Sequence, residues 1–285
     1  MLLFYKYVTV PNPQKTANWL RGLAVRYRLL GRGIVAEEGI NATFEGLLDD
    51  TEKFAKEVLQ NPLFADMHIK RSVGDGKGFG KLSVKVRDEI VGTKFSREDA
   101  DPRVRTAPRV SPQELKEWYQ NNKDFVVVDM RNDYEFASGH FKNAIEPGIV
   151  ASRDLPQALP KLEPLKDKTV LTVCTGGVRC EKMSAYLLSK GFENVYQLDG
   201  GIHSYMEQYP GEDFLGTLYT FDNRLTMDFG GEREIIGACD FCEGKTERYV
   251  NCANNTCHRH FLVCVQCLPL TDTPYCNDAC KESVE

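Results

Sequence analysis

Three short, nearly continuous apolar runs constrain the fold of this chain more than any other feature. They cover residues 126–130, 169–173 and 195–198. Strands that are apolar along their length are typical of a parallel sheet that is buried on both faces. Helical patterns alternate with these runs, near 111–120, 133–138, 181–190 and 202–209. Residues 111–212 are therefore predicted to form a doubly wound α/β domain.

A different order of elements is predicted before this domain. Strands are expected at 2–8, 33–36, 41–44, 67–71 and 81–87, with helices after Asn12 and at 51–60. The order β-α-β-β-α-β, with an extra strand allowed, predicts a ferredoxin-like (acylphosphatase-like) domain over residues 1–95. Residues 96–110 carry seven charges and two prolines without periodicity, and are predicted to be a linker.

Cysteine is concentrated in the last part of the chain, residues 213–285, where eight of the ten cysteines follow position 238. They form four pairs, and two such pairs complete a four-cysteine site for a tetrahedral ion such as zinc. The two predicted sets are Cys239, Cys242, Cys264 and Cys267, and Cys252, Cys257, Cys276 and Cys280. His258 or His260 could replace one ligand of the second set. A reduced or partly disulfide-bonded tail is the alternative.

The composition argues against a membrane-spanning or exported protein. No apolar run approaches the roughly 20 residues that a spanning helix needs. The start, MLLFYKYVTV, contains Lys6 and has no basic leader, so we expect a cytoplasmic protein. The net charge of −5 is uneven, because residues 1–95 carry 15 Lys and Arg against 11 Asp and Glu. This domain is therefore expected to face an anionic partner.

The segment VCTGGVRCE, residues 173–181, lies between a predicted buried strand and a predicted helix. Such a turn directs backbone N–H groups and the positive end of the helix at the loop, so Cys174 is predicted to be a thiolate nucleophile. Arg179 adds positive charge. An inert buried cysteine is the alternative. The residues assigned to the cradle are Thr175, Gly176, Gly177 and Val178.

The spacing within this loop also bears on the chemistry. Four residues separate Cys174 from Arg179, one fewer than in protein phosphatases that use a cysteine nucleophile. The smaller ring suits a single sulfur atom, or a thiolate approached by a flat group, better than a phosphate. Phosphatase chemistry is therefore disfavoured.

Positive charge is also concentrated between residues 70 and 87, around a turn that contains four glycines. A flexible basic strand–loop–strand hairpin can follow a phosphate backbone, and Phe79 could stack on a base. A solvated strand face is the alternative. The residues assigned to RNA contact are Lys70, Arg71, Lys77, Lys81, Lys85 and Arg87.

Longer motifs identify a family that this chain resembles. DMRNDYEFASGHFKNAI (129–145), CTGGVRCEKMSAYL (174–187) and NVYQLDGGI (194–202) are similar to a rhodanese domain. With GIVAEEGINATF (33–44), KLSVKVRDEIV (81–91) and the cysteine block in the same order, nearly the whole chain resembles the rhodanese-like tRNA uridine hydroxylases. The resemblance implies an oxidoreductase that uses molecular oxygen to form 5-hydroxyuridine at the wobble position of tRNA. It places the catalytic cysteine at Cys174 and the second cysteine at Cys180.

The sequence does not decide the role of several other residues of these motifs. Asp129 and Arg131 end a predicted strand where an open α/β sheet places its ligands, but an internal ion pair explains them equally well. His140 is expected to be a packed structural histidine. No role can be assigned to three residues of the first family motif, Glu37, Glu38 and Asn41.

No flavin, haem, non-haem iron or dinucleotide site is recognisable in the sequence, although oxygen normally needs a cofactor to react. Two alternatives to the hydroxylase therefore stay open. One is a sulfurtransferase that carries a persulfide on Cys174. The other is a binding protein in which the rhodanese-like loop docks a partner and the cysteine-rich part recruits another.

Overall fold

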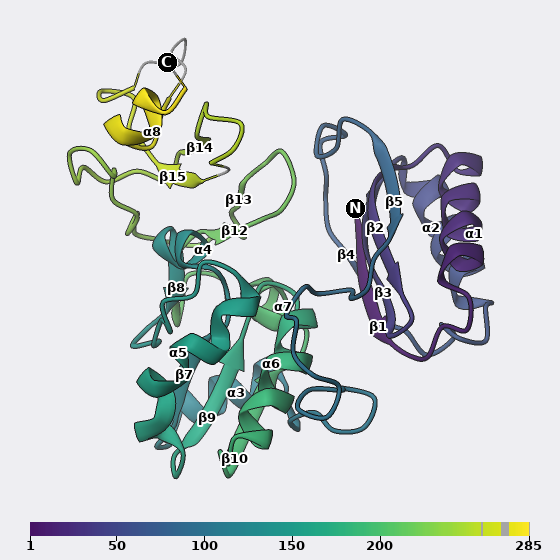
Figure 1. The fold of residues 1–285 in the computed structure, drawn as a ribbon, viewed down its shortest axis with the longest axis horizontal. Coiled ribbons are helices and arrows are strands. Elements are labelled where there is room, and N and C mark those ends of the chain that lie inside the picture. Colours follow the sequence, from purple (N-terminus) through teal and green to yellow (C-terminus); the bar gives the residue numbers. More distant parts are fainter. Residues whose placement is uncertain (258, 269–273, 285) are drawn as a thin grey trace.

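The computed structural model describes residues 1–257, 259–268 and 274–284, which fall into three parts (Figure 1). We call them the N-terminal module (residues 1–95), the central module (109–216) and the C-terminal segment (217–284). No helix in the described residues is long and apolar enough to cross a membrane.

The N-terminal module is a five-stranded sheet with two helices on one face. In spatial order the strands are β4 (Ile69–Arg71), β1 (Leu2–Tyr7), β3 (Gly39–Glu45), β2 (Leu30–Ala36) and β5 (Leu82–Val86). The helices α1 (Pro13–Arg26) and α2 (Leu48–Leu59) cover the outer face, and the other face is turned toward the central module (Figure 1). The predicted ferredoxin-like order is confirmed, with β5 as an extra strand parallel to β2.

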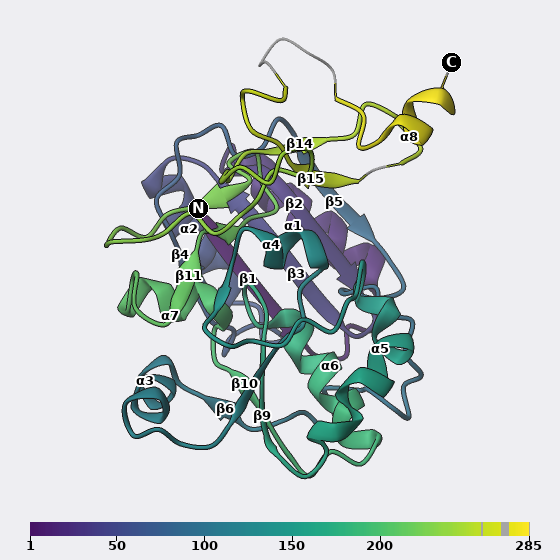
Figure 2. The same ribbon diagram turned by 90° about the vertical axis from the view of Figure 1, so that its left-hand side faces the viewer.

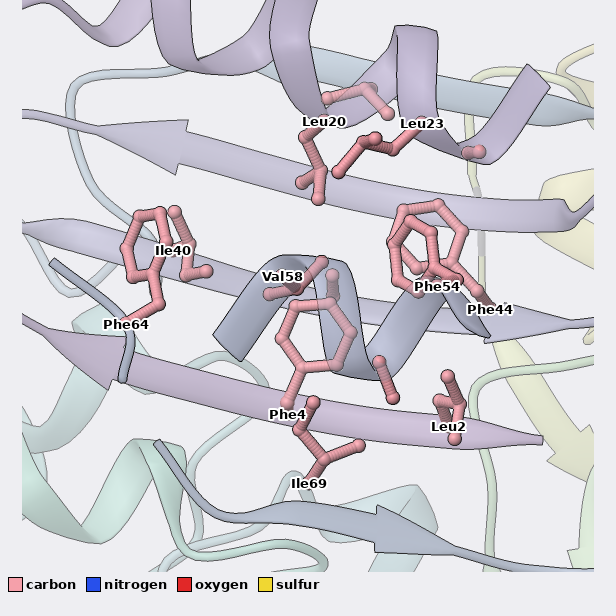
Figure 3. Close-up of a cluster of buried hydrophobic side chains, with 14 of the residues drawn as sticks. Leu2, Phe4, Leu20, Leu23, Ile40, Phe44, Phe54, Val58, Phe64 and Ile69 are labelled. Carbon is pink, nitrogen blue, oxygen red and sulfur yellow. The ribbon is translucent and has the colours of Figure 1, made fainter. Parts of the chain in front are cut away.

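Side chains alternate between the two faces of this sheet. Leu2 and Phe4 of β1 are buried under the helices, where Phe4 packs against Phe54 (Figure 3). The alternate residues of the strand, Leu3 and Tyr5, point to the opposite face and line a cavity there. The pleat of β1 therefore separates the residues that form the core from those that face the central module.

The basic segment between Lys70 and Arg87 is not the hairpin that the sequence suggested. β4 pairs with β1 and β5 pairs with β2, so the two strands lie at opposite edges of the sheet. The glycine-rich stretch between them is held by Glu45, whose carboxylate accepts the N–H groups of Gly78 and Phe79. The positive charges are therefore spread over a loop and two edges instead of one face.

The central module is a parallel sheet with an apolar cluster on each face. Its strands, in spatial order, are β6 (Arg109–Val110), β10 (Asn194–Leu198), β9 (Thr169–Val173) and β7 (Val126–Asp129). Its helices are α3 (Pro112–Gln120), α4 (Asp133–Ala137), α5 (Leu155–Leu162), α6 (Val178–Ser189) and α7 (Gly201–Gln208), with 3₁₀ turns at Ser152–Asp154 and Glu163–Leu165. The doubly wound α/β prediction is confirmed. The sequence did not predict α5 or the pair β8 (Gly139–Phe141) and β11 (Phe214–Gly216).

The predicted linker, residues 96–110, contacts both modules, and its last two residues are not linker but the strand β6 of the central sheet. Arg97 pairs with Glu37 of the N-terminal module at 2.9 Å. Thr106 Oγ1 donates to Glu181 Oε2 of the central module at 2.8 Å. These contacts explain Glu37 as a structural partner of the linker.

The C-terminal segment contains two small hairpins, β12 (Leu218–Tyr219) with β13 (Thr226–Met227) and β14 (Tyr249–Asn251) with β15 (His260–Leu262), and the helix α8 (Asp278–Glu282). Its own apolar cluster consists mostly of cysteine side chains with Phe261 and Val263. It rests on α4, as Figures 1 and 2 show. There His260 stacks on Tyr134 with ring centres 5.3 Å apart, and the Tyr249 hydroxyl donates to the Tyr134 carbonyl.

Candidate active site

Cys174 follows β9 at the carboxyl end of the central sheet, where open α/β sheets place their ligands. Its side chain is fully buried, and the Gly177 N–H donates to Cys174 Sγ at 3.2 Å. Gly177 has φ +99°, a left-handed conformation that favours glycine, and it directly precedes α6. The sulfur therefore lies in a tight strand-to-helix turn at the positive end of a helix.

This loop stabilises the ionised form of Cys174. Burial alone would raise the pKa of the thiol, but a hydrogen bond from the Cys180 side chain, the Arg179 charge and the N–H groups of Cys180 and Gly177 lower it to about 5. Burial and the contact with Cys174 raise the pKa of Cys180 well above its usual value. Near neutral pH the pair is therefore a thiolate with a thiol that donates to it.

Arg179 is held by Glu135, a residue that the sequence analysis missed. The two form a bidentate ion pair, with Nη1–Oε2 at 2.5 Å and Nη2–Oε1 at 2.8 Å, and Arg179 Nη2 also donates to Thr175 Oγ1 at 3.0 Å. Burial would lower the pKa of Arg179, but Glu135 raises it, so the guanidinium remains charged beside Cys174. Glu135 belongs to α4, the helix on which the C-terminal segment rests.

Lys70 reaches the Cys174 loop from the other module. Its side chain is buried, and Nζ donates to the Gly176 carbonyl at 2.7 Å and to the Gly200 carbonyl. Burial lowers the pKa of Lys70 to about 8, against the raising effect of the Cys174 charge. The structure therefore corrects the RNA contact expected for Lys70, because its ammonium group is buried and already bonded to two carbonyls.

Two tyrosines of β1 extend this contact between modules. The Tyr5 hydroxyl lies 3.3 Å from Glu181 Oε1, and the Tyr7 hydroxyl donates to the Val178 carbonyl at 3.2 Å. Burial is the largest cause that raises the pKa of both tyrosines, so both remain neutral hydrogen-bond donors. The face of the N-terminal sheet that carries no helices therefore packs against the Cys174 loop and the start of α6.

The motif that contains Glu38 and Asn41 also joins the modules. Lys182 of α6 is buried and pairs with Glu38 at 2.8 Å and with Glu89 at 2.7 Å. Asn41 Nδ2 donates to the Ile90 carbonyl at 3.2 Å. These two residues, whose role the sequence left open, thus fix the chain around residue 90 between the sheet and α6.

Beside these contacts, a cavity of about 430 Å³ lies between the N-terminal sheet and the Cys174 loop. This volume lies within the range of roughly 300–1,000 Å³ typical of small-ligand sites. From the sheet it is lined by Leu3, Tyr5, Arg32, Ile34, Asn41 and Thr43, and from the loop by Thr175, Gly176, Val178 and Arg179. Cys174 is fully buried behind these loop residues, so a ligand in the cavity meets the loop before the sulfur.

His203 of α7 lines the same cavity and was not identified from the sequence. Its backbone N–H donates to the Thr175 carbonyl at 3.0 Å. Burial, followed by the charges of Lys70 and Arg224, lowers the pKa of His203 to about 4. The imidazole is therefore neutral near pH 7.

Asp129 and Arg131 form an internal ion pair. Neither side chain has exposed surface, and Arg131 Nη2 lies 2.7 Å from Asp129 Oδ2. His140 stacks on Phe136 with ring centres 4.0 Å apart. These contacts favour structural roles for all three residues over a direct part in the chemistry.

The other basic residues assigned to RNA contact have different surroundings. Arg71 is bonded to both carboxylate oxygens of Glu52, at 2.7 and 2.9 Å. Lys77, Lys81, Lys85 and Arg87 are exposed like Arg71, but in the described part of the chain these four have no carboxylate within 4.0 Å. These four keep the surface position that contact with a phosphate backbone requires.

The eight C-terminal cysteines converge in two groups of four. The groups are Cys239, Cys242, Cys264 and Cys267, and Cys252, Cys257, Cys276 and Cys280, and within each the Sγ atoms all lie within 4.8 Å of one another. Four thiolates at such separations fit one tetrahedral ion. His260 belongs to neither group, because its Nδ1 is 3.1 Å from the Tyr219 hydroxyl, and His258 lies outside the described residues.

Family models match three successive parts of the chain. They are described as UPF0176 acylphosphatase like domain (residues 1–90), Rhodanese-like domain (residues 111–208) and Rhodanase C-terminal (residues 215–281). A solved rhodanese-like domain protein from Staphylococcus aureus is 30% identical, covers 34% of this chain and 90% of that chain, and has a TM-score of 0.31.

Relatives also match nearly the full length. A tRNA uridine(34) hydroxylase from Bacillus velezensis is 39% identical over 99% of this chain and 88% of its own. Another, from Staphylococcus haemolyticus, is 41% identical over 92% of this chain and 83% of its own. With identity at this level over nearly the whole length, the chain belongs to the family of the tRNA uridine(34) hydroxylases.

Proposed function

We propose that this protein hydroxylates carbon 5 of uridine 34 in tRNA, with molecular oxygen as co-substrate and Cys174 as the catalytic nucleophile. The relatives carry this activity in their name. The observation that carries the assignment of Cys174 is its stabilised thiolate, in a loop that lines a cavity between two modules. The protein is then a cytoplasmic oxidoreductase, and Lys77, Lys81, Lys85 and Arg87 are its exposed candidates for contact with the tRNA backbone.

A thiolate can assist this reaction by covalent catalysis. Carbon 5 of uracil is weakly nucleophilic, because the ring carbonyls withdraw electron density from its double bond. Addition of Cys174 Sγ to carbon 6 forms a sulfur–carbon bond, breaks the π bond between carbons 5 and 6 and leaves an enolate whose electron density lies on carbon 5. Once carbon 5 has bonded to one oxygen atom, loss of its proton and of the sulfur–carbon bond restores the double bond and the thiolate. An external two-electron donor, with two protons, reduces the second oxygen atom to water. Because Sγ is covered in this structure, the loop around Gly176 and Gly177 must move for the bond to form.

Transfer RNA with 5-fluorouridine at position 34 is expected to form a covalent adduct with the enzyme. Fluorine on carbon 5 cannot leave as a cation, so the bond between Cys174 and carbon 6 persists. The adduct is detected as a protein–RNA band and mapped to Cys174 by mass spectrometry. An enzyme that is active on ordinary tRNA but gives no adduct would exclude the carbon 6 route and favour a persulfide on Cys174 that reacts with oxygen first.

Nucleoside mass spectrometry of tRNA from a deletion strain tests the proposed function. Loss of 5-hydroxyuridine and its derivatives, restored by the wild-type gene, is the expected result. Loss of thiolated uridine instead would point to sulfur transfer through a Cys174 persulfide. An unchanged profile would leave only the binding-protein interpretation.

A Lys70→Met variant is expected to lower the rate of hydroxylation at saturating tRNA by about 10²-fold, because misplacement of a catalytic loop by about 1 Å has effects of this size. Lys70 holds the Gly176 and Gly200 carbonyls, so its loss frees the loop. The affinity for tRNA should change by less than the rate, since the ammonium group is buried.

The matched control is Lys85→Met, which removes an exposed lysine from the same module. It is expected to weaken tRNA binding and to flatten its salt dependence, with an unchanged rate at saturating tRNA. Thermal unfolding of both variants separates these effects from loss of folding. A Lys70→Met variant with a normal rate and weakened tRNA binding would contradict the positioning role.

A further inference from the structure

Three arginines line the cavity between the modules, and two of them are engaged by carboxylates. Arg179 forms its bidentate pair with Glu135. Arg224 binds both oxygens of Asp222, at 2.8 and 2.7 Å, and Asp222 is the one acidic residue in the described lining. In the part of the chain that the structure describes, Arg32 has no carboxylate within 4.0 Å.

Arg32 is placed in the cavity by the pleat of the N-terminal sheet. It lies opposite Thr43 in the register of β2 and β3, and the next pair on the same face is Ile34 with Asn41. All four residues line the cavity. The Arg32 guanidinium lies over the ring of Phe221, 5.4 Å from its centre. Burial is the main cause that lowers the pKa of Arg32, and the charge of Asp222 opposes it only in part, from beyond ion-pair distance.

The second guanidinium over Phe221 is that of Arg179, also 5.4 Å from the ring centre. Phe221 therefore links the unpaired cation to the loop of the nucleophile. At the Cys174 loop, the charge of Arg179 is offset by Glu135 and the Cys174 thiolate, which disfavours an anion there. On the sheet side of the cavity, Arg32 offers a planar set of N–H donors, which binds phosphate oxygens in bidentate fashion.

The rest of the lining suits a flat base. Leu3, Ile34, Phe79, Ile90, Val178 and Phe221 supply apolar surface to the same cavity. Ligand sites are typically apolar with a few placed polar groups, and enzymes that modify a base take it out of its stack into such a pocket. The cavity thus has a largely apolar lining, the Cys174 loop on one side and, on the sheet side, an arginine that forms no ion pair within the described residues.

We propose that this cavity binds the target uridine as an extruded nucleotide and that Arg32 binds a phosphate next to it. This inference rests on the proposed function, because it takes tRNA as the substrate. Arg32 is then a binding residue that sets the position of the base relative to the Cys174 loop. It differs from the exposed lysines, whose contacts would lie along the remaining tRNA backbone.

A double-mutant cycle between protein and RNA tests this contact. Arg32→Gln removes the charge while keeping a polar side chain, and a methylphosphonate removes the charge of one phosphate, placed on the 5′ or the 3′ side of uridine 34. On ordinary tRNA, Arg32→Gln is expected to weaken binding about tenfold and to reduce the salt slope by about one. On the RNA that lacks the contacted phosphate, wild type and Arg32→Gln should bind equally.

Arg87→Gln is the control, because it removes the same charge from an exposed site of the same module. Any loss of affinity that it causes should remain on both methylphosphonate RNAs. The proposal is overturned if Arg32→Gln causes no loss on ordinary tRNA, or if its loss is unchanged on both modified RNAs. These experiments measure tRNA binding. Failure of the proposed function would instead appear as absence of 5-hydroxyuridine after incubation with the wild-type enzyme. A wrong assignment of Arg32 can therefore be distinguished from a wrong assignment of the activity.

Discussion

A Cys174→Ser variant is expected to form 5-hydroxyuridine at least about 10³-fold more slowly than the wild type, since removal of a catalytic nucleophile has effects of this size or larger. The loop lowers the pKa of Cys174 to about 5, but the same groups cannot ionise a serine hydroxyl near neutral pH. Mass spectrometry of nucleosides from tRNA incubated with each protein measures the loss. The affinity for tRNA should be unchanged, because Cys174 has no exposed surface.

The ionisation of Cys174 can be followed independently of turnover. The difference in ultraviolet absorbance between wild type and Cys174→Ser reports the thiolate, which should be present above pH 5 and lost as the pH falls through about 5. Normal activity of the serine variant would rule out both enzymatic roles of this residue, hydroxylation and persulfide transfer. A titration midpoint near pH 9 would show that the loop does not stabilise the thiolate.

Protein purified without chelators is expected to contain two zinc ions per chain, one in each four-cysteine group. Removal of the metal should unfold the C-terminal segment, because its apolar cluster consists mostly of the cysteines themselves. Structural zinc sites contribute about 10–16 kcal/mol to folding in small metal-binding units, more than such a cluster can replace. Elemental analysis and hydrogen exchange over residues 237–284 measure the two effects.

Loss of the metal should also lower the rate of hydroxylation, because the C-terminal segment packs on α4 and α4 carries the residue that holds Arg179. The segment packs on Tyr134, and the next residue, Glu135, holds Arg179. Cys242→Ser and Cys257→Ser are each expected to remove one zinc ion, whereas Cys180→Ser should retain both. Reduced, folded protein with almost no metal would contradict the assignment of these cysteines as ligands.

Local patterns were sufficient for most secondary structure. The run at 169–173 matches β9 residue for residue, since a short, mostly apolar strand has few other ways to be buried. The loop after it follows from glycines and a helix start that lie next to Cys174 in the chain. The cysteine spacing likewise suggested the two groups of four, because closely spaced pairs can share one ion. The short helix α5 and the short strands β6, β8 and β11 were missed, because their patterns are weak and their pairing partners are distant in the chain.

The sequence by itself determined the three-part organisation, the candidate nucleophile with its loop, and the candidate metal ligands, because each depends on residues that are close in the chain. Only the tertiary structure decided what surrounds the loop. Lys70 bonds to Gly176 across 106 positions, and Glu38 meets Lys182 in a different module. The alternation of a strand shows which side chains share a face, but not what covers that face. A buried charge needs partners that only the fold can supply, and so Lys70, predicted to contact RNA, instead holds the loop that contains Cys174.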